Sequence, residues 1–334
     1  MPRSSRHVAR LMFLLVLLAS FGAVACKRKR PPLPYFGVLD RREARAPSPA
    51  EQALLDDADH SLERTHGDPR ILASAREKLR RALQTNPDLP LAYVLLAKIE
   101  LLSGYRSYDF YDPAAIQRAQ EPIRIALSYE PPVWRTYYWA AAILLAERRY
   151  AEAEEMSKLA YQMSPEAPRI WIFRADFMRL YHHYDEAIAQ LQRHVLDNPA
   201  STDLERAHAY EVLTGVYGGK GDDAAEDAAF QSELALVPDD PWIDCNYAAF
   251  LRRVGRLDEA EARIRKALSE MNFGMAHHVL GSIYVAQGKL ALQRGDAADA
   301  SALFSRALVE DEKLAKSILE IDPSNQAARA IVDR

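Results

Sequence analysis

Apolar and polar positions between residues 51 and 322 follow the period of amphipathic helices almost throughout, and no stretch shows convincing strand alternation. Successive segments repeat one arrangement: a small residue, a bulky residue four positions later, a small one three later, and proline five later. Ala119, Ile123, Ala126 and Pro131 are one instance. Because proline cannot continue a helix, it marks the end of each segment. The pattern predicts a series of helical hairpins.

This arrangement recurs with a fixed spacing. Positions 119, 153 and 187 are 34 residues apart, and so are prolines 131, 165 and 199. Small residues at these places let two helix backbones approach closely. We count seven hairpins, of which the second has ten extra residues and the last extends around Gly295 to about residue 321. His194 replaces the second small residue of the fourth hairpin, which predicts a looser crossing there.

The hairpin at residues 241–272 carries the pattern most clearly, with Ala248, Ala260 and Ala267 where its helices touch and a turn at Gly255. It resembles the tetratricopeptide repeat, a helix-turn-helix unit of about 34 residues. The resemblance implies an all-α fold, a right-handed solenoid over residues 50–322 with a polar capping helix at 323–334. It also implies a protein that holds another polypeptide.

The resemblance further implies which side chains face a concave groove. In such arrays they occupy the second, fifth, sixth, ninth and twelfth positions of the first helices. The residues are Arg135, Tyr138, Trp139, Arg169, Ile172, Phe173, Asp176, Arg179, His208, Glu211, Trp242, Asn246 and Arg252. The carboxylate clamp of chaperone-binding members is missing at these positions. Aromatic residues flanked by arginines are typical of protein interfaces, although Trp139, Ile172 and Phe173 are equally compatible with interhelical core.

The first 25 residues have the composition of a secretory signal, with three arginines before an apolar run of 15 residues (11–25). That run is shorter than the ~20 residues of a membrane-spanning helix. Cys26 follows three small residues and so resembles the acylated cysteine of a bacterial lipobox, although Ala23 stands where leucine is usual. A short membrane anchor is the alternative, which the basic residues 27–30 favour because positive charges resist translocation.

Residues 26–49 are basic and rich in proline, which predicts an extended linker. The basic residues 27–30 also suit anionic lipid head groups. The formal net charge is −4, and without the three leader arginines it becomes −7, with 40 basic against 47 acidic residues. This charge gives no indication of a nucleic-acid partner. Cys26 and Cys245 lie in different contexts, so we expect no disulfide.

We expect no catalytic residue, metal or cofactor. The quartet at residues 218–221 fails as a phosphate loop because Thr214 stands in place of a glycine and Gly221 in place of Ser or Thr. Neighbouring helical residues point about 100° apart, so the doublets at 182–183 and 277–278 cannot chelate alone, and no partner stands at zinc spacing.

Residues 103–115 add four aromatic side chains, Tyr105, Tyr108, Phe110 and Tyr111. We interpret the segment as local support for a lengthened hairpin; as an exposed loop it would be a second docking point.

These observations favour a membrane-tethered scaffold or adaptor of the bacterial cell envelope, on the periplasmic side of the outer membrane, that binds a protein or peptide. An anchored adaptor that faces the cytoplasm is the alternative. An enzyme with an unrecognised site is less favoured.

Replacing the lipobox cysteine tests the lipoprotein hypothesis. We expect the wild-type protein to incorporate labelled palmitate, and Cys26→Ser to leave the chain unprocessed or released from the membrane, because two or more acyl chains are needed for stable attachment. A Cys26→Ser protein that migrates and fractionates like the parent would contradict lipidation and favour the cytoplasmic-facing anchor.

Overall fold

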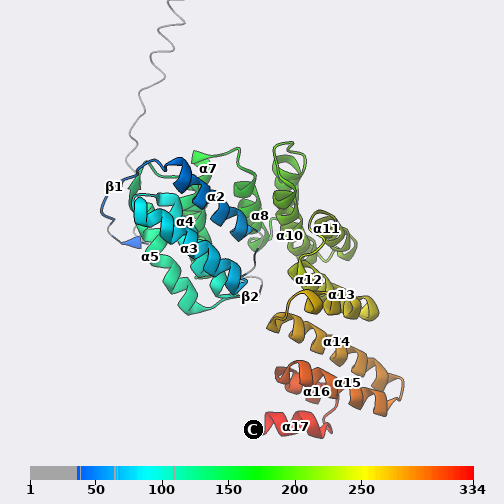
Figure 1. Cartoon of the computed structure of the whole chain (residues 1–334). Coiled ribbons are helices and arrows are strands. Elements are labelled where there is room, and N and C mark those ends of the chain that lie inside the picture. The colour runs from blue at the N-terminus through cyan, green and yellow to red at the C-terminus, as the bar shows by residue number, and fades with distance from the viewer. Residues whose placement is uncertain (1–35, 38, 64, 66, 108–109) are drawn as a thin grey trace, which may run out of the picture. The chain divides into compact units, whose positions relative to one another are not determined.

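The computed structural model describes residues 36–37, 39–63, 65, 67–107 and 110–334 of the chain. The predicted signal peptide, Cys26, the basic residues 27–30 and Tyr108 lie outside this part. The chain divides into two units, residues 1–38 and 39–334. The second unit consists of α-helices in successive antiparallel pairs (Figure 1). Over the described residues, none of the helices has the length and apolar character needed to cross a membrane.

The helices of residues 49–310 form seven hairpins, as the sequence predicts. In chain order they are α2 Pro49–Glu63 with α3 Pro69–Thr85, α4 Pro90–Ser103 with α5 Pro113–Ser128, α6 Trp134–Ala146 with α7 Tyr150–Met163, α8 Pro168–Leu180 with α9 Tyr184–Leu191, α10 Asp203–Lys220 with α11 Asp223–Leu236, α12 Pro241–Arg253 with α13 Leu257–Glu270, and α14 Gly274–Gln293 with α15 Ala297–Glu310.

Proline and aspartate fix where many of these helices begin. Prolines occupy the first turn of α3, α4, α5, α8 and α12, where the missing N–H has no intrahelical partner to lose. Asp68, Asp112 and Asp240 stand just before α3, α5 and α12, and each carboxylate accepts a bond from a backbone N–H of the first turn. The second helices α5 and α7 end at Ser128 and Met163, three and two residues before the predicted prolines 131 and 165.

The turn inside most hairpins needs one residue with a left-handed backbone. Gly221 and Gly255 take φ angles of 73° and 83°, and Arg148 and His182 take 61° at the same place in two other hairpins. Glycine adopts this conformation without strain. Residues 218–221 therefore form the end of α10 and its turn. His182 is a turn residue whose Nδ1 lies 2.6 Å from the Tyr184 hydroxyl.

The predicted crossing residues are buried. Ala119, Ala153, Ala260 and Ala267 are 0% exposed and Ala160 is 1% exposed. Larger apolar side chains around them join successive hairpins, so that buried clusters run through the first, middle and last parts of the unit. The periodic small residues thus mark the interior of each hairpin.

The fourth hairpin accommodates His194 by a change of helix type. After α9 the chain continues as a π-helix, η2 Gln192–Leu196, which moves Val195 into the buried position at 0% exposure. His194 instead stacks on the Trp171 ring, with the ring centres 3.7 Å apart. The π-helix thus puts Val195 at the crossing, where the other hairpins have a small residue.

The last hairpin ends earlier than the sequence predicts. α15 stops at Glu310 rather than near residue 321, because Asp311 has an extended backbone and its carboxylate accepts the Lys313 N–H. A 3₁₀ turn, η3 Glu312–Leu314, leads into α16 Ala315–Ile321 and then α17 Gln326–Val332. His277 Nδ1 lies 2.6 Å from Glu310, and His278 Nδ1 lies 2.7 Å from Asp311. These histidines join α14 to the end of α15.

Short strands appear where the sequence predicted none. β1 Arg42–Glu43 pairs in parallel with β4 Tyr129–Glu130, so the end of the predicted linker packs on the second hairpin. β2 Tyr105–Ser107 pairs antiparallel with β3 Phe110–Tyr111. Each has two or three residues, too few for alternation to reveal.

The alanine crossings predict the response to enlargement. We expect Ala160→Leu and Ala267→Leu each to lower the free energy of unfolding by about 1–3 kcal/mol, because the helices must move apart. Ala298→Leu, at an exposed position of α15, is the control and should change it by less than ~0.5 kcal/mol. Urea unfolding measures all three; midpoints equal to the parent in both core variants would contradict the assigned register.

Candidate functional site

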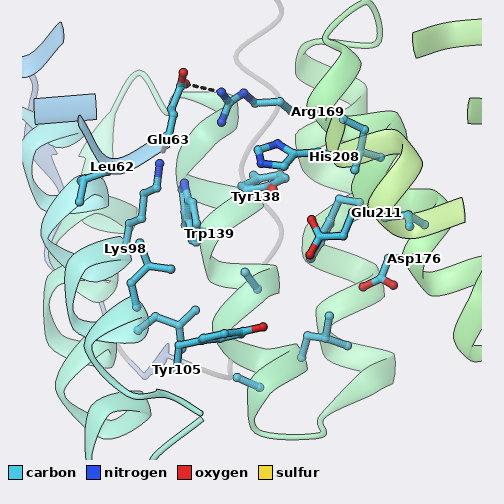
Figure 2. A pocket seen from close by; sticks show the side chains of 18 of the residues that line it. Leu62, Glu63, Lys98, Tyr105, Tyr138, Trp139, Arg169, Asp176, His208 and Glu211 are labelled. Carbon is cyan, nitrogen blue, oxygen red and sulfur yellow. Dashed lines mark hydrogen bonds and ion pairs between the residues drawn. The ribbon is translucent and has the colours of Figure 1, made fainter. Parts of the chain in front are cut away.

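The first helices of the first five hairpins surround a cavity of about 300 Å³, which we call the groove (Figure 2). Figure 2 shows Tyr138 and Trp139 facing Asp176 and Glu211 across it. Its lining residues are Leu62, Glu63, Thr65, Lys98, Leu101, Leu102, Tyr105, Tyr111, Tyr138, Trp139, Ala142, Leu145, Ala146, Arg169, Ile172, Phe173, Asp176, Arg179, His208, Glu211 and Val212.

Aromatic rings form much of one wall. The Tyr138 ring centre lies 4.9 Å from that of Phe173 and 5.3 Å from that of Trp139. Ile172 and Phe173 are each 9% exposed, so they belong to the core as well as to the wall, whereas Tyr138 and Trp139 are partly exposed. Desolvation raises the pKa of Tyr138, so its hydroxyl remains protonated and able to donate a hydrogen bond at neutral pH.

The arginines that the resemblance predicts along the groove are already paired inside the protein. Arg169 forms an ion pair with Glu63 at the end of α2, 106 residues earlier, and its Nε lies 3.8 Å from Glu205 Oε1. Arg135 Nη2 lies 2.6 Å from Asp59 Oδ2. Acidic residues of α2 therefore already neutralise two of the arginines that the resemblance places along the groove.

Arg179 is paired within its own helix. Its Nε donates to Asp176 Oδ1 at 2.7 Å. Since residues three apart on a helix are neighbours, this contact needs no distant partner.

Lys98 is the buried cation of the groove, only 4% exposed. Its Nζ lies 3.6 Å from Asp59 Oδ1 and 5.4 Å from the Trp139 ring centre. Burial lowers its pKa from 10.5 to about 8; the Asp59 charge opposes this shift and the nearby Arg169 charge adds to it.

A second cavity of about 530 Å³ adjoins the groove and shares Glu63, Thr65, His208 and Glu211 with it. We call it the acidic pocket. Its acidic lining residues are Glu63, Asp68, Asp203, Glu211, Glu233, Asp239 and Asp240. Its other lining residues are Thr65, His208 and apolar side chains, and none of the described lining residues is lysine or arginine.

Glu233, near the end of α11, is 5% exposed. Burial raises the pKa of its carboxyl well above the usual range, and the charges of Glu211 and Asp240 raise it further. Among the described residues, no side chain or backbone group donates a hydrogen bond to this carboxyl.

The segment at residues 103–115 reaches beyond its own hairpin. The Tyr105 ring centre lies 5.6 Å from that of Tyr111 and 5.0 Å from that of Trp242 in the sixth hairpin. Trp242 in turn packs on Phe273, with the ring centres 4.4 Å apart. The aromatic segment therefore contributes to the groove wall in addition to supporting the second hairpin.

A family profile described as tetratricopeptide repeat matches residues 144–209, from the end of α6 into α10. The hairpins on both sides of this region repeat the same alanine and proline spacing. The chain has the fold of a tetratricopeptide-repeat solenoid. A comparison with curated proteins gives no match.

Solved structures share this fold. Human IFIT1, as a dimer with PPP-AAAA, is 15% identical with a TM-score of 0.58, over 84% of this chain and 67% of its own. The APC/C hetero-tetramer Cut9-Hcn1 is 16% identical with a TM-score of 0.55, over 84% of this chain and 55% of its own. A tetratricopeptide repeat protein from Parabacteroides merdae is 18% identical with a TM-score of 0.45, over 82% of this chain and 99% of its own. At such identities the likeness concerns the fold alone.

The structure places the predicted groove residues in four groups. Seven line the groove, namely Tyr138, Trp139, Arg169, Ile172, Phe173, Asp176 and Arg179. Trp242 lines the acidic pocket. Arg135, Asn246 and Arg252 line neither cavity. His208 and Glu211 line both.

The groove also contains residues outside the predicted set. Lys98 and Leu101 are the ninth and twelfth residues of α4, the first helix of the second hairpin, so the same positional rule indicates them. Glu63 and Glu233 carry no such signal. They reach the cavities from the ends of α2 and α11, and only the three-dimensional arrangement reveals this.

Lys98 predicts a pH-dependent stability. Its folded-state pKa of about 8 lies below 10.5, so between these values the unfolded chain binds more protons and stability rises with pH. Below pH 8 the destabilisation is fully present. We therefore expect Lys98→Met to be more stable than the parent at pH 7, with a difference that shrinks as the pH rises from about 8 toward 10.

Urea unfolding across this pH range measures the effect, with Lys289→Met at an exposed position as the matched control. A constant difference between Lys98→Met and the parent at every pH would show that Lys98 is not desolvated.

Proposed function

We propose that this protein is a membrane-tethered adaptor that holds a segment of a partner protein in the groove. The observation that carries the proposal is the groove itself, a cavity walled by five first helices with partly exposed aromatic side chains beside charged ones. Aromatic side chains bury large areas and dominate interface energies. Such a wall suits an extended or helical peptide better than a compact small molecule.

The charge around the cavities favours a polypeptide over a nucleic acid. Glu63, Asp176 and Glu211 line the groove, and the acidic pocket adds further carboxylates. The groove arginines Arg169 and Arg179 each form an ion pair with an acidic side chain of the protein. Phosphate groups would meet repulsion there, whereas nucleic-acid binders present clustered basic side chains.

We further propose that acylated Cys26 tethers the protein to the periplasmic side of a bacterial outer membrane, where it serves assembly of a cell-envelope complex. The small residues before Cys26 and the proline-rich residues 26–49 support this. A cytoplasm-facing adaptor is the alternative. An enzymatic role has less support, since the titratable Lys98 lies beside Asp59 and the Trp139 ring, and structural ion pairs also shift pKa values.

Site-specific crosslinking tests the binding surface. We expect a photo-reactive p-benzoylphenylalanine at Val212, which lines the groove, to form a covalent adduct with a partner protein in vivo. The same substitution at Val309, which is 86% exposed on α15, is the matched control and should give none. Mass spectrometry of the adduct identifies the partner and its segment.

Equal adducts at both positions, or an adduct at Val309 alone, would move the binding surface away from the groove. Adducts composed only of lipid or nucleic acid would contradict a polypeptide partner.

A further inference from the structure

One carboxyl group of the acidic pocket accepts no hydrogen bond and forms no ion pair within the described part of the chain. Some of the pocket's carboxylates have clear structural roles: Glu63 pairs with Arg169, and Asp240 accepts the Trp242 N–H at 2.8 Å. Asp203 Oδ1 lies 3.1 Å from Arg206 and Asp68 Oδ2 lies 3.0 Å from Arg70. Glu233 has no such role.

Glu233 is the decisive residue because it is buried, charged by type, and lacks a donor. Its side chain is 5% exposed and lines the pocket. A carboxylate that is almost enclosed and accepts no hydrogen bond from the protein is costly, and proteins normally satisfy or avoid one. The neighbouring Glu211 and Asp240 increase the cost, since like charges repel. A cation in the pocket would relieve both contributions.

The pocket suits an organic cation rather than a metal ion. Within the described part of the chain, no three His, Cys, Asp or Glu side chains converge as metal ligands. The volume of about 530 Å³ lies in the range of ~300–1,000 Å³ that is typical of ligand pockets. Carboxylates spread over such a volume match the several spaced N–H donors of a guanidinium or ammonium group.

The pocket is also continuous with the groove. Glu63, His208 and Glu211 line both cavities, so a chain lying along the groove passes the entrance of the pocket. We propose that the acidic pocket receives an arginine or lysine side chain of the partner segment, with Glu233 as the carboxylate that pairs with it. This inference rests on the proposed function, because it assigns the chemistry of one side chain of the bound peptide.

Selection from a display library of random 12-residue peptides tests the assignment. Full-length protein is immobilised as wild type, Glu233→Gln, Asp239→Asn and Glu320→Gln. Gln keeps the shape of Glu and removes its charge, Asp239 lies at the exposed rim, and Glu320 is an exposed residue of α16 that serves as matched control. Circular dichroism verifies that each variant is folded.

We expect wild type and Glu320→Gln to select peptides enriched in one basic position, and Glu233→Gln to lose that enrichment. A selected peptide should bind Glu233→Gln about tenfold or more weakly, as for loss of one charge-assisted bond, and Asp239→Asn less weakly. Replacing its basic residue by citrulline should weaken wild-type binding and leave Glu233→Gln unchanged.

The failures are distinguishable. Peptides selected without basic enrichment, or with enrichment that persists in Glu233→Gln, would overturn the pocket assignment and leave the groove proposal standing. No peptide selected by wild type would overturn both.

Discussion

The close approach of two helix backbones at buried alanines is the contact on which this structure depends. Ala160 and Ala267 let the helices of a hairpin touch, but so small a side chain leaves broad apolar faces that one hairpin cannot bury alone. Each hairpin must therefore stack on the next. Stacking places first helices next to one another, and the groove is the surface that they form.

Contacts between distant hairpins then determine the shape of the groove and which of its side chains are already paired. The ion pair of Glu63 with Arg169 joins the first hairpin to the fourth, and the rings of Tyr105 and Trp242 join the second to the sixth. Both contacts limit how far the array can open. A partner that enters the groove must fit beside these contacts or replace them. It can pair most readily with charged groups that form no ion pair within the protein.

The sequence predicts the local part of this arrangement well and the distant part poorly. Alanine and proline spacing predicts the seven hairpins because each crossing involves residues within one 34-residue unit. The positional rule places Tyr138 and Phe173 on the groove wall for the same reason. The pairing of Glu63 with Arg169 depends on curvature accumulated over 106 residues, to which every irregular hairpin contributes. The π-helix at His194 is one such contribution.

Two buried ionisable residues differ in whether the fold itself compensates their burial. The charge of Lys98 has Asp59 and the Trp139 ring beside it, so its burial is partly compensated within the fold. The charges that act on the carboxyl of Glu233 are those of Glu211 and Asp240, and a glutamine of the same shape would avoid the repulsion. Local conflict of this kind is expected at functional sites rather than in structural core. The conflict at Glu233 disappears when a cation from outside the fold lies beside it.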